Sequence, residues 1–439
     1  NALDNELSGS LQMTSYRASW VLPISGPPLR DAWVSVSDGL VTEVGTGRAP
    51  SPVVELGDVA LLPGLVNAHT HLELSWMAGL VPPAGSMDEW IKTLLSVRRA
   101  GPAGGDETVV TAMTRAVGDI LDTGTALVGD ISNSLMSVPV FAARELACVV
   151  FHEILGFNPA DPQAMVRDAQ ERRRVSLKRP LRSFQGVADP KRPQRSFSDT
   201  PDAFSSVVGH APYSTAPALF AEIAAQHQGP APLSVHIAES AEEVEFLHTG
   251  QGPMRTLLET LGVWTGAWQV PRCGPLEFLK RLGYLKPGTL LVHGVHLTVR
   301  ELEQARDAEA VIVTCPRSNT WVGGGVPPIA RFYGAGVPVA IGTDSLASAE
   351  TLNMFDELAA LRRLAPEVDA AQLLDSATRV GAEALGFGQH YGTISPGRQA
   401  QLVSVALPAG VRGRPEDVEE YLVSGVSAAD VSRLNVPSH

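Results

Sequence analysis

Two hydrophobic patterns divide the chain. Between residues 20 and 45, short β-type runs alternate with turn residues, and Asp38-Gly39 stands between two such runs as a strong hairpin signal. From about residue 63, short apolar runs alternate with helical patterns, which is typical of a parallel sheet with crossover helices. Near the C-terminus the chain returns to β character. We therefore expect a small β unit, made from both chain ends, beside a central α/β unit.

The central unit contains eight apolar runs of strand length, which is the number that closes a (β/α)8 barrel. We expect these strands at residues 61–68, 126–130, 148–153, 206–210, 233–236, 289–293, 311–315 and 337–344. The predicted fold class is therefore α/β, a TIM barrel with a small β-sandwich domain built from both chain ends. We place the composite β-sandwich at residues 13–62 plus 389–439 and the barrel at residues 63–388.

Charge and cysteine content narrow the class of function. The 439 residues carry 34 Lys and Arg against 47 Asp and Glu, a formal net charge of -13. Nucleic-acid binding depends on clustered basic residues, so this balance disfavours a nucleic-acid partner and favours a small-molecule substrate. The three cysteines show no paired spacing, and no apolar run reaches the length of a membrane span. We expect a cytoplasmic protein without a membrane partner, and the sequence leaves a homodimer open.

One segment is basic, although the chain as a whole is acidic. Residues 171–201 are rich in Arg, Lys and Pro. A nucleic-acid-binding arm is one interpretation. A solvated insertion is the favoured one, because runs of charge usually lie at the surface and this one falls between a helix and the next strand, at the floor of a barrel.

Two histidines follow the first predicted barrel strand. His69 and His71 are two residues apart, so on an extended chain their side chains point to the same side. Histidine is a common metal ligand, and this spacing is suited to chelation. The alternative is a pair of unrelated surface histidines.

Three further strand ends carry polar residues. His236 ends the fifth predicted strand and is followed by Glu239, His293 ends the sixth, and Asp344 ends the eighth. Taken singly, each could be a hydrogen-bonded core histidine or a helix-capping aspartate. Catalytic residues of this fold collect at the carboxyl ends of the strands, so their joint occurrence favours a catalytic metal site.

Five runs around these residues closely resemble the amidohydrolase superfamily, within the branch of cytosine, guanine and S-adenosylhomocysteine deaminases and triazine chlorohydrolases. The resemblance covers about residues 20 to 410. The runs, in chain order, are Pro63-Gly64-Leu65-Val66-Asn67-Ala68-His69-Thr70-His71, His236-Ile237-Ala238-Glu239, His293-Gly294-Val295-His296-Leu297, Cys315-Pro316-Arg317-Ser318-Asn319 and Gly342-Thr343-Asp344-Ser345.

The resemblance implies a role for each of the polar residues at the strand ends. It makes His69, His71, His236 and Asp344 the metal ligands. The metal would lower the pKa of a bound water, so that hydroxide attacks the aminated ring carbon and ammonia leaves. Asp344 would take the water proton, Glu239 would protonate the ring nitrogen, and His293 would steady the developing oxyanion.

The resemblance also bears on the cofactor. Binuclear members of the superfamily use a bridging lysine on the fourth strand, whereas residues 207–213 here contain no lysine. We expect one divalent metal ion, zinc, with iron as the alternative. The same stretch resembles the branch's His-x-Pro-Tyr element, so His210 is a predicted substrate contact. The alternative is a structural histidine at a helix start.

Substrate contacts are less sharply indicated. Glu73 lies in a segment that resembles 6-aminodeoxyfutalosine deaminases of menaquinone biosynthesis, and its carboxylate could accept ribose hydroxyls. Trp76 could stack on a ring or simply pack in the core. Arg317 or Arg98 could meet a substrate carboxylate. These interpretations stay open at this point.

The leading hypothesis is a metal-dependent deaminase of an adenine-bearing nucleoside. We expect 6-aminodeoxyfutalosine first, then S-adenosylhomocysteine, methylthioadenosine and adenosine. Two alternatives keep the metal site, a chlorohydrolase and a guanine or pterin deaminase. Glu239 favours deamination, because ammonia needs protonation to leave and chloride does not. A non-catalytic barrel that serves as a binding module is the alternative from another class, and it is disfavoured because the chain has every expected ligand.

Overall fold

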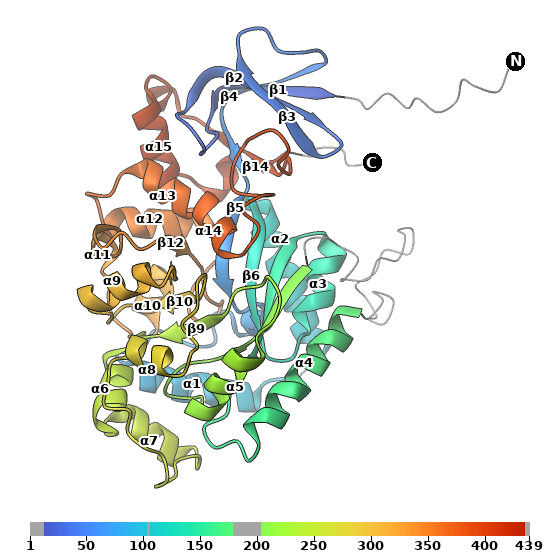
Figure 1. Ribbon diagram of the computed structural model, residues 1–439. Coiled ribbons are helices and arrows are strands. Elements are labelled where there is room, and N and C mark those ends of the chain that lie inside the picture. Colours follow the sequence, from blue (N-terminus) through green and yellow to red (C-terminus); the bar gives the residue numbers. More distant parts are fainter. Residues whose placement is uncertain (1–12, 103–105, 179–202, 435–439) are drawn as a thin grey trace, which may run out of the picture.

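The computed structural model describes residues 13–102, 106–178 and 203–434. A β unit with both antiparallel and parallel strand pairs lies at one end of the molecule (Figure 1). A barrel of parallel strands surrounded by helices forms the rest. The predicted α/β architecture with a TIM-barrel-like core is confirmed.

One six-stranded sheet joins the two ends of the chain. Its order is β14-β13-β4-β1-β2-β3. Antiparallel pairing of β13 with β4, from Leu402 opposite Pro63 to Ala406 opposite Val59, connects the C-terminal strands to the N-terminal ones. That this unit is a sandwich stays a prediction. The strands are β1 (Thr14–Val21), β2 (Leu29–Ser37), β3 (Leu40–Thr46), β4 (Val53–Pro63), β13 (Leu402–Ala406) and β14 (Val431–Arg433).

The predicted hairpin is present in this sheet. Strands β2 and β3 pair antiparallel on either side of Asp38-Gly39. Both turn residues have positive φ, +51° at Asp38 and +72° at Gly39. Positive φ at both central positions defines the turn that matches the twist of the flanking strands, which is why Asp-Gly indicated it.

The barrel consists of two four-stranded parallel half-sheets, β5-β6-β7-β8 and β12-β11-β10-β9. The halves meet at Thr70 and Asp344, which form an isolated parallel bridge, and at His236, whose N–H donates to the His210 carbonyl at 2.9 Å. Residues of the predicted site therefore lie at both seams. The strands are β5 (Leu65–Thr70), β6 (Thr125–Ser132), β7 (Ala147–Ile154), β8 (Ala203–Gly209), β9 (Ser234–Ile237), β10 (Leu290–His293), β11 (Val311–Thr314) and β12 (Val339–Ile341).

Two strand predictions were wrong in their bounds, and the eighth, expected at residues 337–344, is only the short β12. Residues 61–68 were expected as a single barrel strand, but the chain leaves the six-stranded sheet at Pro63 and enters the barrel at Leu65. Gly64 makes the transition. A Cβ on it would lie 2.4 Å from Ala126 Cβ, so only glycine lets the two backbones approach there.

Helices cover the outside of the barrel and the side of the six-stranded sheet (Figure 1). They are α1 (Met87–Ala100), α2 (Glu107–Asp122), α3 (Ser137–Arg144), α4 (Pro162–Lys178), α5 (Pro217–Gln226), α6 (Ala241–Thr249), α7 (Pro253–Thr260), α8 (Pro275–Arg281), α9 (Val299–Asp307), α10 (Pro316–Trp321), α11 (Ile329–Gly334), α12 (Met354–Leu364), α13 (Ala370–Ser376), α14 (Arg379–Ala384) and α15 (Pro415–Ser424). Short 3-10 turns are η1 (Leu72–Met77), η4 (Ala409–Val411) and η5 (Ala428–Asp430).

Most of the basic segment predicted at residues 171–201 lies outside the described residues. Its first part is the end of α4, where Arg174 pairs with Glu171 at 2.6 Å and Arg173 donates to the Ser205 carbonyl. Among the described residues, no helix combines the length and apolar character that crossing a membrane requires.

Candidate active site

The polar residues predicted at strand ends converge at one end of the barrel. His69 lies in β5 and His71 directly follows that strand, His236 lies in β9, and His293 is the last residue of β10. Asp344 lies three residues beyond β12. Because the strands are parallel, their carboxyl ends open on the same face, which brings residues distant in sequence together.

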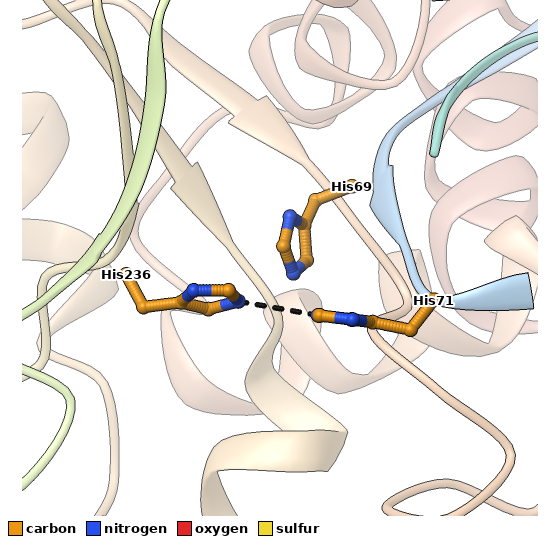
Figure 2. A group of neighbouring side chains, drawn as sticks. All are labelled: His69, His71 and His236. Atoms are coloured by element: carbon orange, nitrogen blue, oxygen red, sulfur yellow. Dashed lines mark hydrogen bonds between the residues drawn. The ribbon is translucent and has the colours of Figure 1, made fainter. Parts of the chain in front are cut away.

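Three histidine rings form the centre of the cluster (Figure 2). The Nε2 atoms of His71 and His236 lie 3.2 Å apart. The His69 ring stands edge-on to both, with centroids 4.9 Å from His71 and 5.0 Å from His236. One nitrogen from each ring lies within 4.8 Å of the others, which is close enough for all three to bind one metal ion.

Hydrogen bonds set the orientation of His236. Its Nδ1–H donates to the His210 carbonyl at 2.9 Å, which directs the Nε2 lone pair toward His71. Backbone acceptors of this kind fix the tautomer of metal-binding histidines. Both ring nitrogens of His69 are buried and lack a hydrogen-bond partner among the described residues. A buried polar atom without a partner is rare, so the ring of His69 fits the role of a metal ligand.

Asp344 completes this group. Its Oδ1 lies 3.5 Å from His71 Nε2 and 3.9 Å from His69 Nε2. Its Oδ2 accepts from the hydroxyls of Ser318 and Ser348. The serines hold one carboxylate oxygen and leave the other facing the histidines. Asp344 also has a φ of +58°, a strained backbone of the kind that gathers at functional sites.

The four side chains fit a divalent metal such as zinc. Imidazole nitrogens with one carboxylate are a common ligand set of catalytic zinc, and iron accepts the same donors. Burial first, and then the neighbouring histidines, lower the pKa of His69 and of His71 well below the usual 6.5. The rings are therefore neutral, the state in which histidine binds a metal.

Glu239 and His293 lie beside the four candidate ligands. Glu239 Oε1 is 3.4 Å from His293 Nε2, and atoms of both lie within 4.8 Å of an Asp344 carboxylate oxygen. The Asn319 amide nitrogen donates to His293 Nδ1 at 2.9 Å, so the ring hydrogen of neutral His293 is on Nε2, facing Glu239. Burial, then the charges of Asp344 and Glu243, raise the pKa of Glu239 well above its usual value.

His210 lies next to this cluster, directly after β8. Its ring centroid is 4.7 Å from that of His236. His210 Nδ1 donates to Ser214 Oγ at 2.6 Å, and this hydroxyl donates on to the Ala211 carbonyl. The Nε2 lone pair stays available, and burial lowers the pKa of His210 to about 4. The geometry suits an acceptor of a ligand N–H or O–H.

Glu73 is surrounded by donors from the chain itself. Its carboxylate accepts from the hydroxyls of Ser132 and Ser134 and from the backbone N–H groups of Asn133, Ser134 and Met136, in the loop that leads into α3. These bonds tie η1, directly after His71, to the end of β6. A ribose contact by Glu73 would have to share the same two oxygens and stays a prediction.

Two other predicted contacts are engaged elsewhere. Trp76 packs so tightly on Gly101 that a Cβ there would lie 2.1 Å from the indole. Arg317 Nη1 donates to Thr351 and lies 3.4 Å from Glu357 Oε1, at the start of α12. The structure thus joins Arg317 to α12 and does not bring its Nη1 to the histidines. Their substrate roles stay predictions.

Sequence reasoning missed Glu153. This carboxylate is buried near the end of β7, and its Oε1 lies 3.5 Å from His236 Nδ1. Its Oε2 accepts from Asn133 Nδ2 at 3.0 Å. Burial raises the pKa of Glu153. The strand-end rule that selected His236 could have found it, because Glu153 ends the third predicted strand.

A close backbone approach beside His69 gives a first prediction. A Cβ on Gly342 would lie 2.7 Å from His69 Cβ and 3.0 Å from Cys315 Sγ. Gly342→Ala should lower the free energy of unfolding by about 1–3 kcal/mol through overpacking and should weaken metal binding by displacing His69. Chemical denaturation and metal titration measure the two effects. The matched control is Gly118→Ala in α2, where a Cβ meets nothing within 4 Å. Equal stability and metal affinity of the two variants would contradict the prediction.

A parallel barrel with three histidines, an aspartate and a neighbouring glutamate at its strand ends defines the class of metal-dependent barrel hydrolases. The family model of the Amidohydrolase family matches residues 60–429, and the chain belongs to this family. The family resemblance stated from the sequence motifs is therefore confirmed.

Several proteins with assigned names are similar over most of their length. The 5-methylthioadenosine/S-adenosylhomocysteine deaminase of Moorella thermoacetica is 26% identical over 431 residues, which cover 95% of this chain and 91% of that protein. The aminodeoxyfutalosine deaminase of Deinococcus radiodurans is 29% identical over 353 residues, 77% of this chain and 76% of that protein. A zinc-bound adenosine deaminase of Xanthomonas campestris superposes with a TM-score of 0.75 at 27% identity, over 95% of this chain and 90% of the other.

Proposed function

We propose that this protein is a hydrolytic deaminase of adenine-bearing nucleosides. The observation that carries the proposal is the carboxyl group of Glu239, buried beside His293 and within reach of Asp344, next to a metal-binding set. Ammonia leaves a ring carbon only if protons are delivered to it and to the ring nitrogen, and Glu239 is suited to that role. The deaminase names of the similar proteins support the same reaction class.

His69, His71, His236 and Asp344 would hold one divalent metal, zinc with iron as the alternative, which lowers the pKa of a bound water toward neutrality. The remaining chemistry belongs to side chains. The Asp344 carboxylate, held in place by the two serines at Oδ2, would accept the proton that water loses. Glu239 delivers a proton to the ring nitrogen beside the attacked carbon.

His293 acts on the developing negative charge. Its Nε2–H, fixed by the Asn319 bond to Nδ1, points to the same region as Glu239. A fixed donor in a buried site stabilises an oxyanion more than water does, because it needs no reorientation during the reaction. The side chains of His293 and Glu239 are almost fully buried, so bulk water is kept from them.

The first substrate to test is 6-aminodeoxyfutalosine, followed by S-adenosylhomocysteine, methylthioadenosine and adenosine. His210, with its free Nε2 lone pair, is the best-placed substrate contact of those predicted. Glu73, Trp76 and Arg317 are retained as candidate contacts, although each also has a partner within the chain. A small molecule of this kind is the expected partner.

A panel of adenine nucleosides tests the substrate directly. With the zinc-loaded enzyme, we expect the ultraviolet spectrum to shift from adenine to hypoxanthine for at least one of the four compounds, with 6-aminodeoxyfutalosine turned over at the highest kcat/KM. A different rank order would replace the first choice of substrate. No shift with any adenine nucleoside, while metal is bound, would contradict the proposed function.

Two other functions use the same site. A chlorohydrolase or a guanine or pterin deaminase would keep the metal ligands and change the leaving group or the ring. The buried Glu239 favours ammonia as the leaving group over chloride. A non-catalytic binding barrel is disfavoured, since all four candidate ligands lie together, and metal-free purified protein would favour it.

We also propose a division of the chain at the strand transition near Gly64. Residues 13–62 plus 389–439 would form the composite β domain, as a β-sandwich, and residues 63–388 the catalytic barrel. The pairing of β13 with β4 supports the joining of both ends.

A further inference from the structure

The loop that carries Glu239 has a backbone conformation that L-residues rarely adopt. Ala238, the residue before it, has a φ of +49°. Its carbonyl accepts from His296 N–H at 2.9 Å. On the other side, a Cβ on Gly324 would lie 2.6 Å from the Glu239 carbonyl. A strained turn of this kind persists only where its surroundings hold it in place.

Glu243 holds this turn from the side of α6. Its Oε1 accepts from Ala238 N–H at 2.9 Å, and its Oε2 accepts from Glu239 N–H at 3.1 Å. The side chain is completely buried. Burial raises the pKa of Glu243 to about 8, and the two N–H bonds oppose that shift. A buried carboxyl group is costly unless its oxygens are satisfied, and here both are satisfied by the catalytic loop.

The bonds of Glu243 differ from ordinary helix capping. Glu243 is the third residue of α6, and its N–H donates to the N-cap Ser240. In a capping box, the glutamate at this position returns to the N–H of the N-cap residue, as Glu301 does to Thr298 at the start of α9. The Glu243 carboxylate instead accepts from the N–H groups of Ala238 and Glu239, the two residues that precede the N-cap residue Ser240. Its oxygens therefore serve the Glu239 loop rather than the helix.

We propose that Glu243 is a positioning residue for Glu239, which sets the backbone of the proton-transferring side chain through two hydrogen bonds. This inference rests on the proposed function, which gives Glu239 its role in proton transfer. The hydrogen bonds of Glu243 to the Glu239 loop do not depend on that role. If the turn were released, Glu239 would no longer be held 3.4 Å from His293, and proton delivery would be misaligned.

The test is a double-mutant cycle on the zinc-loaded enzyme. In Glu243→Gln, an amide nitrogen replaces one acceptor and leaves one buried N–H unpaired. We expect kcat for deamination to fall about 10- to 100-fold, with KM and metal content within about twofold of wild type. In a Glu239→Gln background, Glu243→Gln should have no further effect, because the group that it positions is already inactive. Equal losses in both backgrounds would overturn the proposal.

Two controls separate positioning from charge and from capping. Glu242→Gln removes a carboxylate from the same helical turn, and Glu301→Ala breaks the capping box of α9. Both should retain wild-type kcat. If Glu243→Gln does not fold, Glu243→Asp keeps the carboxyl group but is one methylene shorter and should not reach both N–H groups, and it should show the same non-additivity.

Hydrogen exchange gives a readout without substrate. In Glu243→Gln, the amides of Ala238 and Glu239 should exchange faster than in wild type, while those of β9 should not change. Unchanged exchange at both amides would overturn the proposal even if activity fell. If wild type deaminated no nucleoside, the proposed function would fail and the exchange measurement would still judge the role of Glu243.

Discussion

Replacing Glu239 by Gln should lower kcat for deamination by about 10²- to 10⁴-fold, the usual contribution of a positioned general acid and base. The amide keeps the shape of the side chain but cannot deliver a proton to the ring nitrogen or to the leaving amine. Glu239 Oε1 lies 3.4 Å from His293 Nε2, and Glu239 is not one of the four candidate metal ligands. Zinc content should therefore stay that of wild type. Steady-state kinetics and metal analysis of the same preparation measure both quantities.

The matched control for this prediction is Glu245→Gln, an exposed carboxylate on α6. It should retain wild-type kcat. A substrate analogue with chloride in place of the amino group sharpens the comparison, because chloride leaves without protonation. Glu239→Gln should lose less activity toward this analogue than toward the amine. Full deaminase turnover by Glu239→Gln would show that the proton-transfer assignment is wrong.

Replacing Asp344 by Asn should have an effect at least as large. The substitution removes the only anionic member of the four candidate ligands and the acceptor for the water proton. We expect weaker zinc binding and a fall in kcat of more than about a thousandfold, since the loss of a general base alone accounts for about 10²- to 10⁴-fold. Metal titration of the purified variant and its kcat at saturating zinc separate the two contributions.

The control for Asp344→Asn is Asp369→Asn. Asp369 is an exposed N-cap residue of α13 whose side chain makes no capping bond. It should bind zinc and turn over substrate as wild type does. Wild-type zinc affinity in Asp344→Asn would remove Asp344 from the ligand set, while an unchanged kcat at saturating zinc would remove it as the proton acceptor.

The candidate metal site could be predicted because strand ends are visible in the sequence. His69, His236, His293 and Asp344 each follow or end an apolar run, and a barrel topology alone brings such positions to one face. The same reasoning placed the hairpin at Asp38-Gly39, where the required positive φ values match the residue types.

Other features depend on tertiary contacts that no local pattern indicates. The break at Gly64 reflects a close approach to Ala126, more than sixty residues away. The engagement of Glu73 by the loop before α3 depends on how β5 and β6 align. The spacing of Ser240 and Glu243 resembles a capping box, yet the carboxylate binds the catalytic loop instead. In each case the sequence contains the residue, and only the fold supplies its partner.

The most direct test of the account is to follow the reaction of the zinc-loaded enzyme with 6-aminodeoxyfutalosine and the other adenine nucleosides in heavy-oxygen water. We predict that each substrate molecule turned over releases one ammonia and that its product contains one oxygen from water. Chelator-treated enzyme should form no product until metal is restored. Zinc-loaded enzyme that leaves every nucleoside unchanged, or chelated enzyme that deaminates as fast as the loaded form, would contradict a metal-dependent nucleoside deaminase.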